Sequence, residues 1–105
     1  MNITHLPENG KLTLALDGRL DAVTSAQFEA ELLPAFGHVK NVELDCTRLS
    51  YVSSAGLRVL LLGQKTAKAQ GATLALKGVS EDVMEVLNMT GFSDILTIQF
   101  AKEQP

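Results

Sequence analysis

The chain has 105 residues, a net charge of −3 at neutral pH and a hydrophobic fraction of 46%. These values predict one globular domain over residues 1–105, with an ordered core over about 2–101. The acidic balance and the lack of a dense Lys/Arg cluster disfavour direct nucleic-acid binding, and no apolar run is long enough for a membrane span. A single cysteine, Cys46, excludes an internal disulfide and favours a cytoplasmic location.

The first half of the chain predicts one strand followed by one helix. Lys11–Leu16 alternates apolar and polar residues, which is typical of a strand, and a turn is expected at Asp17–Asp21. A helix is expected to begin near residue 24 and to end at Gly37. Pro34 is expected to bend or shorten this helix, because proline lacks the backbone donor that a helix interior needs.

The middle of the chain predicts a strand at Asn41–Asp45, a short loop at Thr47–Val52 and a long helix from Ser54 to about Gln70. One side of this helix is apolar and is expected to face the core: Leu57, Leu60 and Leu61. The other side is basic and is expected to face water: Arg58, Lys65 and Lys68.

The last part predicts a strand at Thr73–Leu76, a helix capped by Ser80 and ended by Gly91, and a strand at Ile95–Phe100. Strands and helices therefore nearly alternate. This order predicts an α/β domain with a single sheet and helices packed on it.

No enzyme signature stands out. The two histidines, His5 and His38, have no Cys or carboxylate at metal-binding spacing, and Cys46 is expected to be packed in the interior. Gly63–Thr66 resembles the end of a phosphate-binding loop only faintly, and it lies inside a predicted helix. We therefore predict no catalytic residue, no metal and no cofactor.

Two serines, Ser53 and Ser54, stand at the start of the long helix and are followed by Ala55 and Gly56. Serine is a preferred N-cap residue, so either serine could serve only as a cap. One serine would be enough for capping, however, and glycine costs a helix about 0.5–1 kcal/mol relative to alanine. Gly56 is therefore expected to leave the backbone open to another molecule.

A serine at a helix N-terminus is also well placed to carry a phosphate. The free N–H groups and the positive end of the helix dipole favour an anion there. A phosphate adds about −1.5 to −2 charges, so it would change the surface more than the fold. This is the behaviour that a binding switch requires.

Three segments resemble the STAS domain family, and within it the stand-alone bacterial anti-sigma factor antagonists. They are Asp45 with Ser50–Arg58, the turn Gly18–Asp21, and the helix end Val86–Phe92. The similarity covers nearly the whole chain in the right order. It implies a single mixed β-sheet of four to five strands, with three to four helices packed mainly on one face.

The resemblance also implies a function. Such a protein, when unphosphorylated, binds an anti-sigma factor that is also a serine kinase of the histidine-kinase-like ATPase type, and so frees a sigma factor. The partner phosphorylates a serine that matches Ser54 here, and a serine phosphatase reverses the reaction. The residue before that serine is commonly aspartate in the family, so Ser53 stays open as the alternative site. Asp21 matches an acidic residue near the phosphorylation site.

These inferences define the expected binding surface, which consists of Asp21, Ser53, Ser54, Ala55, Gly56 and Arg58. Arg58 could shield the phosphate charge or could simply be solvated. An alternative function is that of a STAS adaptor subunit in another partner-switching, secretion-control or lipid-transport complex. A small enzyme or nucleotide binder is a third class, for which the sequence offers no site.

Overall fold

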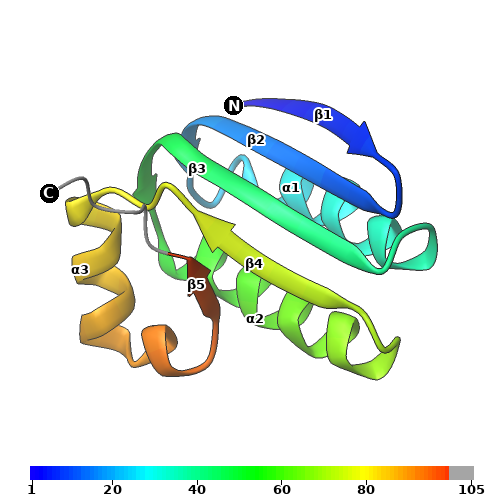
Figure 1. The fold of residues 1–105 in the computed structure, drawn as a ribbon. Helices are drawn as coiled ribbons and strands as arrows, with labels where there is room; N and C mark the ends of the chain where they lie inside the picture. Colours follow the sequence, from blue (N-terminus) through cyan, green and yellow to red (C-terminus); the bar gives the residue numbers. More distant parts are fainter. Residues whose placement is uncertain (100–105) are drawn as a thin grey trace, which may run out of the picture.

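Five strands form one mixed sheet in the computed structural model, which describes residues 1–99 (Figure 1). They are, in chain order, β1 (Asn2–Glu8), β2 (Lys11–Leu20), β3 (Asn41–Val52), β4 (Thr73–Lys77) and β5 (Thr97–Gln99). The order across the sheet is the order along the chain. β1 runs antiparallel to β2, and the remaining neighbours are parallel. The predicted mixed sheet is confirmed.

Three α-helices connect the parallel strands: α1 (Ser25–Leu32), α2 (Ser54–Ala69) and α3 (Glu81–Thr90). The strand order advances in one direction from β2 to β5, so right-handed crossovers place all three helices on the same face of the sheet. Figure 1 shows α1 and α2 behind the sheet and α3 next to β5. Two short 3₁₀ helices, η1 (Leu33–Gly37) and η2 (Phe92–Asp94), follow α1 and α3. The predicted one-sided packing is confirmed.

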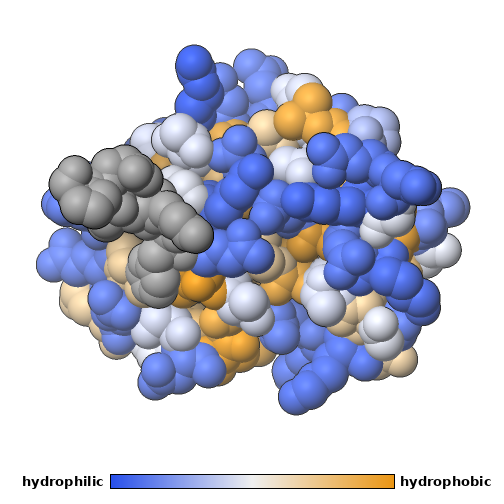
Figure 2. Space-filling view, in the orientation of Figure 1, coloured by the Kyte–Doolittle hydropathy of each residue, from blue (hydrophilic) through white to orange (hydrophobic). Residues whose placement is uncertain are grey.

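The core lies between the sheet and these helices. Leu14 and Leu16 of β2 and Leu44 of β3 are fully buried, together with Phe28 of α1. Their neighbours along the strands point to the other face, because successive side chains of a strand alternate. Figure 2, in the orientation of Figure 1, shows mainly hydrophilic side chains across the middle of this open face. The strand alternation thus separates an apolar helix side from a polar open side.

β3 is longer than predicted, because Thr47–Val52 is strand and not loop. The pairing of β2 with β3 shifts register twice, between Ala15 and Asp17 and between Gly18 and Arg19. Each shift adds one residue to β3, so its buried residues recur every third position, at Cys46, Leu49 and Val52. A spacing of three does not look like a strand in the sequence, which is why this half of β3 was missed.

β1 was also missed by the sequence analysis. It lies at the edge of the sheet, and its side chains are exposed apart from the partly buried Ile3. Pro7 is compatible with an edge strand. Proline has no backbone N–H, and an edge strand needs no N–H donors on the side that has no neighbouring strand. Because β1 has only one neighbouring strand and one partly buried side chain, its sequence shows little of the alternation of apolar and polar residues that predicts a strand.

The prediction that Pro34 shortens the first helix is confirmed. α1 ends at Leu32, and Pro34 lies in the first turn of η1, which ends at Gly37 as expected. The final strand begins at Thr97, two residues later than predicted, because the N–H groups of Ile95 and Leu96 still bond to the Phe92 carbonyl of η2. Phe100, the predicted end of that strand, lies outside the described residues, as do Ala101 and the remaining residues 102–105.

The first turn of α2 lies directly against the end of β2. Gly56 is buried there, and a Cβ atom on it would lie 2.6 Å from Leu20 Cγ and 3.0 Å from the Leu20 carbonyl oxygen. The backbone of α2 can approach β2 this closely only because residue 56 has no side chain. The contact fixes where the two serines before it stand.

We expect Gly56→Ala to destabilise the protein by about 1–3 kcal/mol, because the added methyl overlaps Leu20. This loss exceeds the gain of up to about 1 kcal/mol that alanine brings to a helix. Urea denaturation measures the difference. Gly37→Ala is the matched control, since nothing lies within 4 Å of its added Cβ. Equal stability of both variants would contradict the close contact.

Glu43 lies at the centre of the open face between two lysines. Its Oε1 lies 3.0 Å from Lys11 Nζ and 3.2 Å from Lys77 Nζ. Burial acts to raise the pKa of Glu43, but the hydrogen bonds and charges of the two lysines outweigh it and hold the pKa below its usual value. The carboxylate therefore contributes stability that is fully present above its unfolded pKa of about 4.3 and is lost as the pH falls through the lower folded value.

We expect Glu43→Gln to lower the unfolding free energy at about pH 7, and we expect this difference to shrink as the pH falls below the unfolded pKa of about 4.3, because the stabilisation of the carboxylate is then lost. Chemical denaturation at a series of pH values measures this convergence. Parallel pH profiles for the two proteins would show that the lysines do not stabilise the carboxylate.

Candidate functional site

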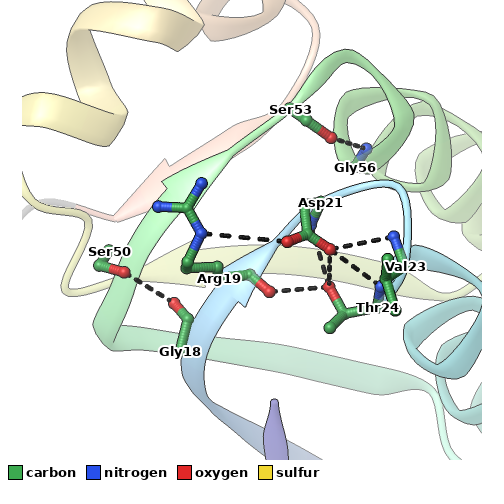
Figure 3. A network of polar contacts seen from close by, with 8 residues as sticks. All are labelled: Gly18, Arg19, Asp21, Val23, Thr24, Ser50, Ser53 and Gly56. Carbon is green, nitrogen blue, oxygen red and sulfur yellow. Dashed lines mark hydrogen bonds and ion pairs between the residues drawn. The ribbon is translucent and has the colours of Figure 1, made fainter.

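The two serines lie where β2 and β3 end side by side. Leu20 pairs with Val52 at the last position of the ladder, and the Ser53 N–H donates to the Leu20 carbonyl at 2.8 Å. This bond ties the start of α2 to the turn that follows β2. Figure 3 shows Ser53 and Gly56 at the start of α2, and it shows the Asp21 carboxylate directed to Arg19, Val23 and Thr24 within the turn.

Ser53 is the N-cap of α2. Its backbone is extended, and its Oγ accepts a hydrogen bond from the Gly56 N–H at 3.3 Å (Figure 3). Its side chain is half-buried, and its carbonyl accepts the Leu57 N–H at 2.9 Å. The Ser53 hydroxyl is therefore occupied in starting the helix, as expected for a preferred cap residue.

Ser54 is the first residue within α2 and is exposed. Within residues 1–99 no hydrogen bond engages its hydroxyl. The adjacent serines thus differ in chemical availability, because one hydroxyl is used by the fold and the other faces solvent. This difference could not be read from the sequence, which left both serines open.

Asp21 closes the turn after β2. Its Oδ1 accepts the N–H groups of Val23 and Thr24, each at 3.0 Å (Figure 3). The Thr24 Oγ1 accepts the Asp21 N–H at 2.9 Å and donates to the Arg19 carbonyl at 2.7 Å. The Thr24 N–H does most to hold the pKa of Asp21 below its ordinary value, and burial opposes it. Within residues 1–99 Asp21 makes no hydrogen bond to Ser53 or Ser54, so it shapes the site through the turn.

The turn presents Val23, which the sequence analysis missed. Its side chain is 85% exposed, more than any other large apolar side chain among residues 1–99. An isolated exposed apolar residue is common, but the backbone of this one is fixed, because its N–H donates to Asp21 Oδ1. The sequence holds no signal for its exposure, because that depends on how the turn closes.

Arg19 and Tyr51 form a cation–π pair, which the sequence analysis also missed. The Arg19 guanidinium carbon lies 4.2 Å from the centre of the Tyr51 ring, and Arg19 Nε lies 3.9 Å from Asp21 Oδ2. Tyr51 is 39% exposed. The second register shift pairs these two residues across β2 and β3, so they meet only because of the bulge.

The remaining predicted site residues lie on the first turns of α2. Arg58 is exposed, and its Nη2 lies 3.4 Å from Glu29 Oε1 of α1. Ala55 is half-buried, and Gly56 is buried against Leu20. The open backbone expected at Gly56 is therefore not found, since the glycine allows an internal contact.

The structure offers no second site with evident chemistry in residues 1–99. Cys46 is buried, as predicted, and burial, helped by Asp45, raises the pKa of its thiol to about 12. His5 contacts Glu31 at 2.7 Å, and no group of three His, Cys, Asp or Glu side chains in this part of the chain could hold a metal ion. None of the helices formed by these residues has the length and apolar character needed to cross a membrane.

Comparisons with known proteins place the chain in a family. The family model described as "Mlab, STAS domain" matches residues 5–97. The chain is 35% identical over 104 residues to BtrV of Bordetella bronchiseptica, named as an anti-sigma factor antagonist, with 98% of this chain and 90% of BtrV covered. It is 24% identical over 103 residues to the anti-sigma-B factor antagonist of Bacillus subtilis, with 98% and 94% covered.

Solved structures of SpoIIAA, an anti-sigma factor antagonist of Bacillus, have the same fold. The unphosphorylated form matches with a TM-score of 0.76 at 20% identity, over 96% of this chain and 90% of that one. The phosphorylated form matches with a TM-score of 0.76 at 21% identity, over 97% and 93%. The resemblance predicted from the sequence is thus confirmed at the level of sequence and of fold, and the chain belongs to the STAS domain family.

Proposed function

We propose that this protein is an anti-sigma factor antagonist whose binding is switched by phosphorylation of Ser54. Its partner would be an anti-sigma factor that is also a serine kinase of the histidine-kinase-like ATPase type, and a serine phosphatase would reverse the modification. The names of the relatives support the antagonist role. The observation that carries the switch is the free, exposed hydroxyl of Ser54 at the start of α2.

Ser54 is a better phosphate acceptor than Ser53 on geometric grounds. A kinase must bring the acceptor hydroxyl into line with the transferred phosphoryl group, which needs an accessible oxygen. The Ser53 oxygen accepts the Gly56 N–H and is half-buried, so its modification would first break the cap. Ser54 can be modified without that cost. The fold thus supplies a reason to prefer Ser54, although Ser53 stands where the family commonly has aspartate.

Phosphorylation of Ser54 would weaken binding through charge and desolvation. A phosphate adds about −1.5 to −2 charges and would have to be buried against the partner. Such a charge costs several kcal/mol in a desolvated interface, which corresponds to roughly a hundredfold loss of affinity or more. The helix N-terminus tolerates the anion, so the fold would persist. Arg58 is a poor shield for the phosphate, because its guanidinium is directed toward Glu29.

In this proposal the protein is the substrate of phosphoryl transfer and not its catalyst. The kinase supplies the nucleotide, the metal and the catalytic groups, while this chain supplies a positioned hydroxyl. The switch would operate in the cytoplasm, where a sigma factor and its regulators act. A constitutive adaptor would not need the free hydroxyl, which favours the switched antagonist over the adaptor function.

We expect Ser54→Asp to weaken binding to the kinase partner roughly a hundredfold, because it places a permanent charge in the interface. The unfolding free energy should change by less than about 1 kcal/mol, because an acidic residue is favourable in the first turn of a helix. Titration calorimetry with the purified ATPase and urea denaturation measure the two effects. Equal binding by wild type and Ser54→Asp would refute the switch.

We expect Ser53→Ala to lose about 1 kcal/mol of stability, because the Gly56 N–H loses its cap. The variant should still be phosphorylated, whereas Ser54→Ala should keep its stability and accept no phosphate. Mass spectrometry after incubation with the kinase and ATP locates the phosphate. Phosphate on Ser53 in the wild-type protein would keep the switch but move it by one residue.

A further inference from the structure

α2 gives a basic face to an otherwise acidic protein. The chain has a net charge of −3, yet the sixteen residues of α2 include three basic residues and no aspartate or glutamate. The basic residues are Arg58, Lys65 and Lys68. Acidic residues must therefore be concentrated elsewhere, and α2 is the element that attracts negative charge.

A shallow apolar hollow lies on this face. It has a volume of about 140 Å³ and is lined by Arg58, Leu61, Leu62 and Lys65. Leu61 and Leu62 are only half-buried, so Leu61 does not face the core fully as predicted from the sequence. Two of its four lining side chains are apolar and the other two are basic. The hollow has room for one branched apolar side chain.

One side of α2 carries a stripe of residues that begins with Ser54, the proposed phosphorylation site, and includes residues that line the hollow. Ser54, Arg58, Leu61 and Lys65 follow one another at spacings of four, three and four, which places them on one side of a helix. Arg58 pairs with Glu29 at 3.4 Å, and 69% of its side chain is exposed. Lys65 is exposed and has no ion pair within residues 1–99. A partner that covers Ser54 therefore meets an exposed arginine that is paired with Glu29, an exposed lysine and an apolar hollow along the same helix.

We propose that this stripe of α2 docks an acidic, amphipathic helix of the partner that modifies Ser54. An apolar side chain of that helix would enter the hollow, and carboxylates next to it would face Arg58 and Lys65. Spacings of three and four residues are those by which two helices contact each other. The inference rests on the proposed function, and it adds the chemistry of the partner segment and the position at which it binds.

The test compares two charge reversals of equal size. Lys65→Glu changes the docking stripe, and Arg48→Glu changes an exposed arginine that lines a hollow of the open sheet face with Asp17 and Asp45. Stopped-flow association with the purified histidine-kinase-like ATPase of the source bacterium gives the rate constants at several salt concentrations. We expect Lys65→Glu to lower the association rate roughly tenfold at low salt, with a smaller effect at high salt, and Arg48→Glu to leave it unchanged.

A second variant tests the hollow itself. Leu61→Ser should raise the dissociation rate, because it removes apolar contact without changing charge, and circular dichroism checks that the helix persists. Equal association rates for Lys65→Glu and Arg48→Glu would overturn the docking stripe while the proposed function stands. An unchanged dissociation rate for Leu61→Ser would likewise overturn the hollow as its apolar contact. Failure of the wild-type protein to bind the ATPase would overturn the proposed function and this inference together.

Discussion

The parallel pairing of β2 with β3 is the constraint on which the rest of the molecule depends. The ladder runs from Lys11 opposite Asn41 to Leu20 opposite Val52, so the two strands begin and end together. The turn after β2 and the start of α2 must then lie next to each other. The bond from the Ser53 N–H to the Leu20 carbonyl continues the pairing into the helix start. Without that shared end, Asp21 and Ser53, which are 32 positions apart in the sequence, would not lie on the same part of the molecule.

The polar groups around this shared end are largely satisfied within the fold. The Asp21 carboxylate is held by two backbone N–H groups, and the Ser53 hydroxyl is held by that of Gly56. Groups that are already bonded within the fold would lose little ordering entropy on contact with another molecule. The hydroxyl of Ser54 differs from these groups, because no hydrogen bond within residues 1–99 engages it.

Local signals in the sequence predicted the elements that local interactions define. Ser80 caps α3 through the Val83 N–H, and Gly91 ends that helix in a left-handed conformation, as their positions indicated. The starts of β2, β3 and β4 at Lys11, Asn41 and Thr73 also matched the predicted ranges. These features depend on residues a few positions apart, which a single sequence displays.

Features that depend on distant pairing were not predictable in the same way. The second half of β3 pairs with β2 only because two bulges accommodate its extra residues. The second of these register shifts places the Tyr51 ring against the Arg19 guanidinium. The exposure of Val23 depends on how the turn after β2 closes. The half-burial of Leu61 depends on how much of α2 is covered by α1 and the sheet. The serine pair itself was found from the sequence, because a helix start is a local signal. Which serine is free required the structure.

The burial of Cys46 makes the protein convenient to label. It is the single cysteine of the chain, it lies in the core, and its thiol stays protonated at the pH of ordinary coupling reactions. A maleimide dye would therefore react with a cysteine introduced at an exposed position and leave the native one untouched. Val23, whose side chain is 85% exposed on the turn that Asp21 closes, is one such position.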